Sequence, residues 1–195
     1  MIVQVENKNY TKEEYLALEG KAEYKSEYHN GKIISMTGGT TNHNRIVINL
    51  CSYLHFALKQ KNAEVFAGDV RLWIPNYNLY TYPDAMAIKG KPIYEGQGTT
   101  TITNPLLIIE VLSQSTSSYD RGNKFRYYRS LPSFQEYILI DQYSYLVEQY
   151  IKTPDHKWLL SEYETQDSLI AFNSIDGEIT LTDIYERVDF TTQNS

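Results

Sequence analysis

The pattern of hydrophobic and polar residues predicts one long helix, and local signals predict two shorter ones. Between residues 42 and 61, apolar side chains recur every three or four positions, which is the pattern of an amphipathic helix. Residues 11–18 begin with Thr11 and carry Glu14 three positions later, a capping box that predicts a short helix. Residues 120–131 are basic and aromatic and stop before a proline, so they predict a further helix.

Strand patterns fill most of the remaining chain. Asn30-Gly31 separates residues 26–29 from residues 32–36 and is the strongest two-residue signal for a β-hairpin. Residues 65–74 alternate between apolar and polar side chains and are expected to form one strand. Further strands are predicted over residues 80–88, 106–113, 137–140, 146–151 and 158–164, with shorter apolar runs near Ile170 and Ile179.

The order of the predicted elements indicates the fold class. Residues 42–141 contain a helix, three strands, a helix and a strand, which predicts an α/β (α+β) core with a mixed central sheet. The hairpin precedes this core, and residues 145–190 are expected to add a meander of strands. Because there is no internal repeat and no low-complexity linker, the 195 residues fit a single domain spanning 1–195.

Composition narrows the function classes. The net charge is −6 and the isoelectric point about 5.2, so the chain is not a general polyanion binder. A nuclease is still compatible, because a carboxylate site counts against the net charge until a metal fills it. The single cysteine, Cys51, cannot form an intramolecular disulfide, and its apolar neighbours at helical spacing favour a packing role.

No segment resembles a membrane or export signal. The chain has no run near the ~18 consecutive apolar residues of a membrane span. Met1 to Glu6 lack the basic and apolar regions of a signal peptide. We therefore expect a cytoplasmic protein without a membrane partner.

Glu110 is the only charged residue in the apolar run 106–113, which predicts a buried central strand. An ionised carboxylate in such a strand costs several kcal/mol unless a positive or hydrogen-bonding group meets it. A metal ion is one such partner. A structural salt bridge to a neighbouring arginine or lysine is the alternative.

Asp84 is a second carboxylate in a predicted strand, and the two strands are candidate neighbours in one sheet. Two carboxylates that converge on a sheet repel each other unless a divalent cation binds between them. Mg²⁺ prefers a few carboxylates together with waters and phosphate oxygens, and it lowers the pKa of a bound water. Asp84 and Glu110 are therefore candidate metal ligands for phosphoryl chemistry.

Several short segments follow one another along the chain, and their order identifies a protein family more specifically than any one segment does. They are EYHNGKI (27–33), YPD (82–84), EVLSQST (110–116), DRGNKF (120–125) and EYILI (136–140). Over residues 10–190 this order resembles the Uma-type endonucleases of bacteria, within the PD-(D/E)XK restriction-endonuclease-like superfamily. The Pro83-Asp84 pair alone is a weak motif.

The resemblance implies a restriction-endonuclease-like core and a metal-dependent phosphodiesterase. Asp84 and Glu110 match the acidic pair that binds Mg²⁺ or Mn²⁺, and the main-chain carbonyl of Val111 matches the usual third protein ligand. DNA is the implied partner. Nucleases of this size commonly act as dimers, so a homodimer is a further expectation.

The chain departs from the superfamily pattern at Leu112, where a lysine belongs two residues after the glutamate. Some members carry this lysine on the following helix, and Lys124 lies in that predicted helix. Lys124 is thus the candidate that orients or deprotonates the nucleophile and stabilises the developing charge. Arg121 on the same helix is a candidate phosphate contact. The alternative is that this basic helix face is simply solvated.

Three other residues have two interpretations each. His43 lies near the start of the helix 42–61, which borders the active site in this superfamily, so it is a candidate contact to a metal-bound water or a phosphate; otherwise it caps the helix or faces solvent. Glu27 in the hairpin is a candidate supplementary metal ligand or an exposed residue. Asp120 is expected to be a helix N-cap more than a ligand.

Three functions are compatible with these observations. The first is a Mg²⁺- or Mn²⁺-dependent endonuclease that acts on DNA. The second, favoured by Leu112 and the negative charge, is an inactive relative that keeps the fold and binds nucleic acid or a protein. The third is an enzyme that uses the two carboxylates as acid and base, for instance on a glycoside.

Overall fold

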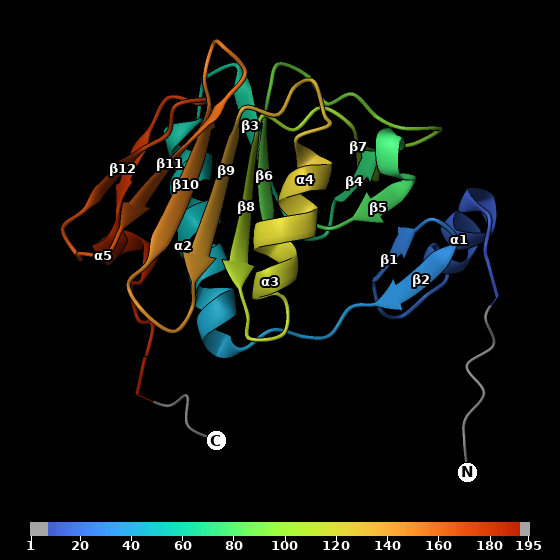
Figure 1. The fold of residues 1–195 in the computed structure, drawn as a ribbon, viewed down its shortest axis with the longest axis horizontal. Helices are drawn as coiled ribbons and strands as arrows, with labels where there is room; N and C mark the ends of the chain where they lie inside the picture. The colour runs from blue at the N-terminus through green and yellow to red at the C-terminus, as the bar shows by residue number, and fades with distance from the viewer. Residues whose placement is uncertain (1–7, 192–195) are drawn as a thin grey trace.

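The computed structural model describes residues 8–191, so Met1 to Glu6, where no signal peptide is expected, lie outside the described residues. A six-stranded sheet forms the centre of the molecule (Figure 1). Its first three strands in spatial order are β11 (Trp158–Tyr163), β10 (Val147–Lys152) and β9 (Glu136–Asp141). The other three are β8 (Leu107–Leu112), β6 (Ala85–Lys89) and β3 (Ala63–Ala67).

This sheet is mixed, as the sequence predicts. β8 runs parallel to β9, whereas β6 runs antiparallel to both β8 and β3. The β9–β10–β11 part is an antiparallel meander. The strands predicted over 106–113, 137–140, 146–151 and 158–164 are therefore confirmed as β8 to β11, with small shifts at their ends.

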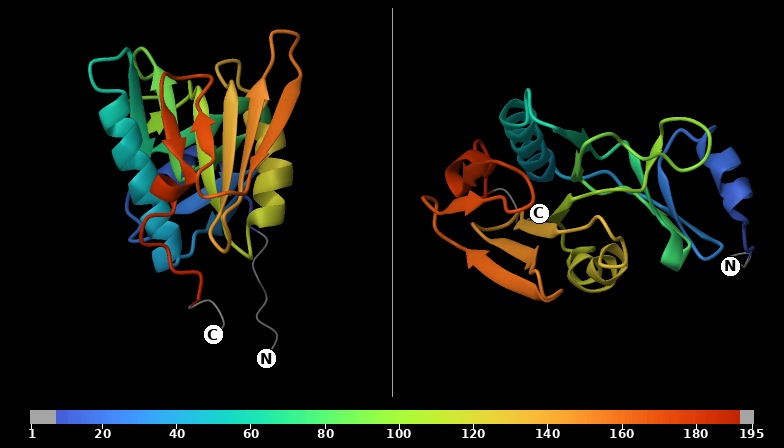
Figure 2. Two further views of the ribbon diagram at one scale, coloured as in Figure 1. Left: turned by 90° about the vertical axis from the view of Figure 1, so that its left-hand side faces the viewer. Right: turned by 90° about the horizontal axis from the view of Figure 1, so that it is seen from above.

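Helices cover both faces of the six-stranded sheet (Figure 2). On one face lies α2 (Thr41–Ala57), whose Ile46, Leu50 and Leu54 are buried against the sheet. On the other lies a continuous helix made of α3 (Ser117–Tyr119), the π-helical turn η2 (Asp120–Lys124) and α4 (Phe125–Tyr128). The core order of helix, three sheet strands, helix and strand is thus confirmed.

A second, five-stranded sheet lies beside the first. In spatial order it contains β2 (Lys32–Ser35), β1 (Ser26–His29), β5 (Leu79–Thr81), β4 (Arg71–Ile74) and β7 (Thr101–Ile102). The β1–β2 hairpin turns at Asn30 and Gly31, whose φ angles of 47° and 89° are those the Asn-Gly signal predicts. α1 (Lys12–Glu19) packs on this sheet through Tyr15, and its capping box at Thr11 is present.

Shorter elements complete the fold. A 3₁₀ turn, η1 (Pro75–Tyr77), connects β4 to β5. Near the C-terminus, β12 (Leu169–Ala171) and β13 (Glu178–Thr180) pair with each other and lead into α5 (Leu181–Ile184). None of the helices within residues 8–191 is both long enough and apolar enough to cross a membrane.

Two strand predictions are wrong, and both errors arise where the chain crosses between the sheets. Residues 65–74 are not one strand, because a turn at Gly68-Asp69 ends β3 in one sheet before β4 begins in the other. Residues 80–88 are likewise divided into β5 and β6 at Pro83, which has no N–H to donate to a sheet. The second break leaves Asp84 at the junction of the two sheets.

The helix boundaries also differ from prediction. The helix expected over 42–61 ends at Ala57, and the one expected over 120–131 begins at Ser117 and ends at Tyr128. Asp120 therefore lies inside a helix, and its prediction as an N-cap is wrong. Cys51 packs, half-buried, against the core between α2 and the sheet, as expected.

Glu136 at the start of β9 anchors the C-terminal segment. Its carboxylate is fully buried and accepts hydrogen bonds from Gln149 Nε2 at 2.5 Å, Ser174 N at 2.8 Å and Ser174 Oγ at 2.6 Å. The main-chain N–H of Asn173 also donates to it, at 3.0 Å. No cation pairs with Glu136 among the described residues, so these hydrogen-bond donors alone stabilise its buried carboxylate.

We predict that Glu136→Ala lowers the free energy of unfolding by about 3 kcal/mol, because it leaves several buried donors without an acceptor. Urea denaturation measures this. Glu164→Ala removes an exposed glutamate in the same half of the chain and should change stability by less than about 0.5 kcal/mol. Equal effects of the two substitutions would contradict the anchoring role.

Candidate active site

Asp84 and Glu110 lie opposite each other on neighbouring strands. β6 pairs antiparallel with β8 with Ala85 opposite Ile109, so the next position of the same register places Asp84 opposite Glu110. Asp84 Oδ2 accepts a hydrogen bond of 2.7 Å from the main-chain N–H of Val111, which replaces the strand pairing that β6 no longer provides. In an extended strand, the N–H and C=O of one residue point to the same edge, so the Val111 carbonyl also faces Asp84.

A cavity of about 530 Å³ opens beside this pair. Six residues singled out in the sequence line it: His43, Asp84, Glu110, Val111, Asp120 and Lys124. The rest of the wall is mostly hydroxyl, amide and glycine groups from three segments: residues 36–40, residues 113–116, and Gln142 with Tyr143. Residues distant in the sequence thus meet in one polar hollow.

Glu110 is the buried charge of this site. Glu110 is only 3% exposed, and its Oε1 accepts hydrogen bonds from Lys124 Nζ at 3.0 Å and from the Tyr128 hydroxyl at 2.6 Å. Burial raises the pKa of Glu110 to about 8; the Lys124 ammonium opposes this shift, whereas Asp120 and Asp84 add to it. Several negative groups and one cation therefore share a small, poorly hydrated volume.

Lys124 supplies that cation from the helix that follows β8. Its ammonium lies between Glu110 Oε1 and Asp120 Oδ1, which is 3.2 Å away. Burial alone would lower the pKa of Lys124, but Glu110, Asp120 and Glu27 outweigh burial and raise it well above its usual range. The π turn η2 spans Asp120 to Lys124, and such turns are frequent at functional sites.

His43 contacts the other carboxylate. It is the third residue of α2, where its main-chain N–H donates to the N-cap hydroxyl of Thr40 at 3.1 Å. Its Nε2 lies 3.2 Å from Asp84 Oδ2. Burial lowers the pKa of His43, but the hydrogen bond and charge of Asp84 prevail and raise it. The N-terminus of α2 thus borders the cavity.

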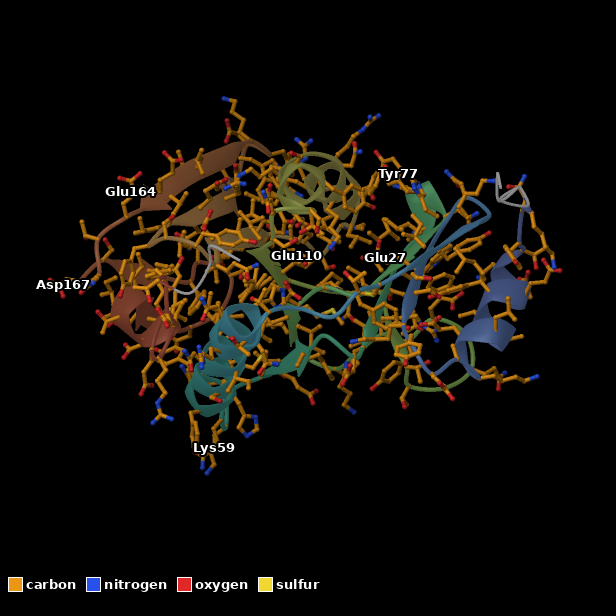
Figure 3. The ribbon with its side chains drawn as sticks, turned by 90° about the horizontal axis from the view of Figure 1, so that it is seen from below. Glu27, Lys59, Tyr77, Glu110, Glu164 and Asp167 are labelled. Atoms are coloured by element: carbon orange, nitrogen blue, oxygen red, sulfur yellow. The ribbon has the colours of Figure 1, made fainter. Side chains whose placement is uncertain are left out.

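Three other residues named in the sequence lie elsewhere. Glu27 is buried rather than exposed, accepts a hydrogen bond from Thr81 Oγ1, and does not line the cavity; Figure 3 shows it on the five-stranded sheet and Glu110 on the six-stranded sheet. The Arg121 guanidinium pairs with Glu148 at 2.6 Å and does not line the cavity. Leu112 shares the sheet face of Glu110 but is buried in the core beneath α4, 2% exposed, and does not line the cavity either.

The sequence did not single out Tyr128 or Gln142 as parts of the site. Tyr128 follows Lys124 by four positions, so helical spacing alone puts both side chains on one face. Gln142 donates to the main-chain carbonyl of Leu112 at 2.8 Å and accepts from Thr40 Oγ1 at 2.5 Å, which ties α2 to the end of β8. No sequence pattern reveals that link, because it joins three distant segments.

Comparison with known proteins assigns the chain to a family. A family model named Uma2 and described as "Putative restriction endonuclease" matches residues 12–183. The chain belongs to the Uma2 family. An uncharacterized protein of Synechocystis sp. is 42% identical over 173 residues, which cover 89% of this chain and 98% of that protein. A second one from the same organism is 36% identical over 178 residues, or 91% and 92% of the two chains.

A solved structure has the same fold as this Uma2 protein. It is the crystal structure of a putative nuclease belonging to DUF820 from Anabaena variabilis, and it matches with a TM-score of 0.73. The match covers 90% of this chain and 97% of that chain at 23% sequence identity. Together with the family match, this likeness confirms the restriction-endonuclease-like fold that the sequence predicts.

The donor atoms of the Uma2 site are suited to a hard divalent cation. Within residues 8–191, no group of three or more His, Cys, Asp or Glu side chains is arranged to hold a metal. Two carboxylates and one main-chain carbonyl, from Asp84, Glu110 and Val111, are instead the sparse oxygen set with which Mg²⁺ retains several waters. Burial is the main cause of the high pKa of Glu110, and the neighbouring carboxylates of Asp120 and Asp84 raise it further, so a cation bound beside these groups would lower it.

The pKa of Glu110 predicts how the metal-free protein responds to pH. The folded value, about 8, lies above the unfolded value of about 4.3. The contribution of Glu110 to stability is therefore fully present below about pH 4.3, decreases as the pH rises from there, and is lost once the pH has passed about 8. In EDTA, the melting temperature of Glu110→Gln should fall less between pH 5 and pH 8 than that of the wild type. Parallel pH profiles would contradict this assignment.

Proposed function

We propose that this Uma2 protein is a metal-dependent endonuclease that hydrolyses phosphodiester bonds of DNA. The observation that carries the proposal is the Lys124 ammonium on the buried carboxylate of Glu110, with Asp84 on the neighbouring strand. An acidic pair can hold a metal ion that activates a water for attack on phosphorus, and an adjacent lysine can stabilise the charge that develops there. The family and the fold, both nuclease-type, support this reading of the site.

Asp84, Glu110 and the Val111 carbonyl would hold Mg²⁺ or Mn²⁺ in this proposal. When bound, such an ion lowers the pKa of a coordinated water and stabilises negative charge at phosphorus. Asp84 is held for this task by its hydrogen bond from Val111 N and by its contact with His43. Glu110 is held by Lys124 and Tyr128.

Lys124 acts in this proposal as a fixed positive charge. Three carboxylates raise its pKa, so it is an ammonium at neutral pH and donates hydrogen bonds rather than accepting a proton. It would therefore orient the attacking water and stabilise the charge that develops on the phosphate oxygens. His43 lines the same cavity and is positioned to donate a hydrogen bond to a bound phosphate.

We predict that Lys124→Ala lowers the rate of plasmid cleavage in Mg²⁺ by roughly 10²-fold or more, the scale on which a single charge-stabilising group acts. Lys157→Ala, at a side chain that is 80% exposed, is the control and should cleave at the wild-type rate. A folded Lys124→Ala protein that also cleaves at the wild-type rate would remove Lys124 from the mechanism.

The same assay tests the proposal as a whole. Wild-type protein should nick or linearise DNA with Mg²⁺ or Mn²⁺ and lose this activity in EDTA, and Asp84→Asn should be inactive under all conditions. A wild-type protein that binds DNA without cutting it under every metal condition would support the inactive relative instead. In that case the buried Lys124–Glu110 pair would have only a structural role.

A further inference from the structure

Tyr128 is a buried polar residue whose contact with Glu110 bears directly on the proposed metal site. It lies on α4, one helical turn after Lys124, and its side chain is fully buried in the core between this helix and the sheet. Its hydroxyl donates a 2.6 Å hydrogen bond to Glu110 Oε1. Burial raises the pKa of Tyr128 well above its usual value, and the neighbouring charge of Glu110 raises it further, so the phenol keeps its proton.

Both donors from this helix contact the same carboxylate oxygen. Lys124 Nζ and the Tyr128 hydroxyl both bind Oε1, whereas Oε2 accepts no hydrogen bond from the residues that the structure describes. Oε2 is also not among the buried oxygens that lack a partner, and Glu110 lines the cavity. Glu110 Oε2 therefore borders the cavity beside Asp84.

Asp84 is arranged in the same way. Its Oδ2 is occupied by the Val111 N–H and the His43 imidazole. Each carboxylate thus has one oxygen held by protein donors and the other available. This pattern suits a cation that takes one oxygen from each of two carboxylates and completes its shell with water.

We propose that Tyr128 is a positioning residue for the metal site: its hydroxyl shares Glu110 Oε1 with Lys124 and so directs Oε2 towards the bound ion. This inference rests on the proposed function. Lys124 has a second partner in Asp120 and a flexible stem, so it alone does not fix the carboxylate plane. The Tyr128 hydroxyl is carried by a rigid ring that packs against Phe134 and Tyr137. Its hydrogen bond therefore restricts the rotation of the Glu110 carboxylate that Lys124 alone leaves open.

Removing the hydroxyl should weaken metal binding while the fold is kept. Partners that orient metal ligands typically contribute about 10- to 100-fold to metal affinity. We expect Tyr128→Phe to weaken Mn²⁺ binding, measured by calorimetry, by about tenfold or more. Near-ultraviolet circular dichroism checks that the aromatic core is intact.

Tyr137→Phe is the matched control. Tyr137 is equally buried in the same core, and its hydroxyl donates to the main-chain carbonyl of Asp120 at 3.1 Å rather than to Glu110. It should lose comparable stability but keep Mn²⁺ affinity within about twofold of the wild type, because it removes a buried hydrogen bond without touching a ligand. Equal Mn²⁺ affinity in Tyr128→Phe and wild type would overturn the positioning role, as would an equal loss of affinity in both variants.

The test separates this inference from the proposed function. If the wild type binds Mn²⁺ and cleaves DNA but Tyr128→Phe binds Mn²⁺ equally well, only the role of Tyr128 is wrong. If the wild type binds no Mn²⁺, both proposals fail.

A second measurement requires no variant, and it decides the question even if Tyr128→Phe does not fold. In wild-type crystals grown with Mn²⁺, the ion should contact Glu110 Oε2 while the Tyr128 hydroxyl stays on Oε1. An ion bound through Oε1, with the phenol displaced, would overturn the inference.

Discussion

Ionising Glu110 inside the sheet that carries it is costly, and the arrangement around β8 follows from this constraint. An isolated carboxylate at 3% exposure costs several kcal/mol, so donors must reach it from whichever element covers that face of the sheet. The covering element is the α3–η2–α4 helix, which provides Lys124 and Tyr128. The π turn within this helix carries Asp120 as a second partner for Lys124. One buried carboxyl group thus determines which polar side chains the α3–η2–α4 helix directs towards the sheet.

Asp84 lies opposite Glu110 because the chain crosses from one sheet to the other just before it. β5 ends in one sheet and β6 begins in the other, and Pro83 lies at the break. Because the strand pairing of β6 starts only at Ala85, the N–H of Val111 is left for the side chain of Asp84. The interruption that a proline imposes on a strand therefore creates the place where two carboxylates and a main-chain carbonyl come together. Neighbouring strands of the six-stranded sheet carry these groups, and the polar loops around them line the cavity.

Much of this could be predicted from the sequence, and the failures have physical causes. Glu110 stood out because a single charge interrupts an apolar run, and Lys124 because the pattern lysine is absent at Leu112; the structure brings both into one ion pair. The strands over 65–74 and 80–88 were predicted as continuous because alternation does not reveal which sheet each half joins. Asp120 was expected at a helix cap because its polar neighbours concealed an earlier helix start. Tyr128 was overlooked because a tyrosine in a core gives no sign of where its hydroxyl points.

The central claim is that Asp84 and Glu110 bind one divalent ion together. The most direct measurement is the stoichiometry and affinity of Mn²⁺ binding by calorimetry for wild type, Asp84→Asn and Glu110→Gln. We predict one ion per chain for the wild type and no measurable binding in either variant, since each substitution removes one of the two anionic ligands. Mn²⁺ binding that persists unchanged in both variants would contradict it, and Glu110 would then be a structural ion-pair residue whose charge is balanced by Lys124 alone.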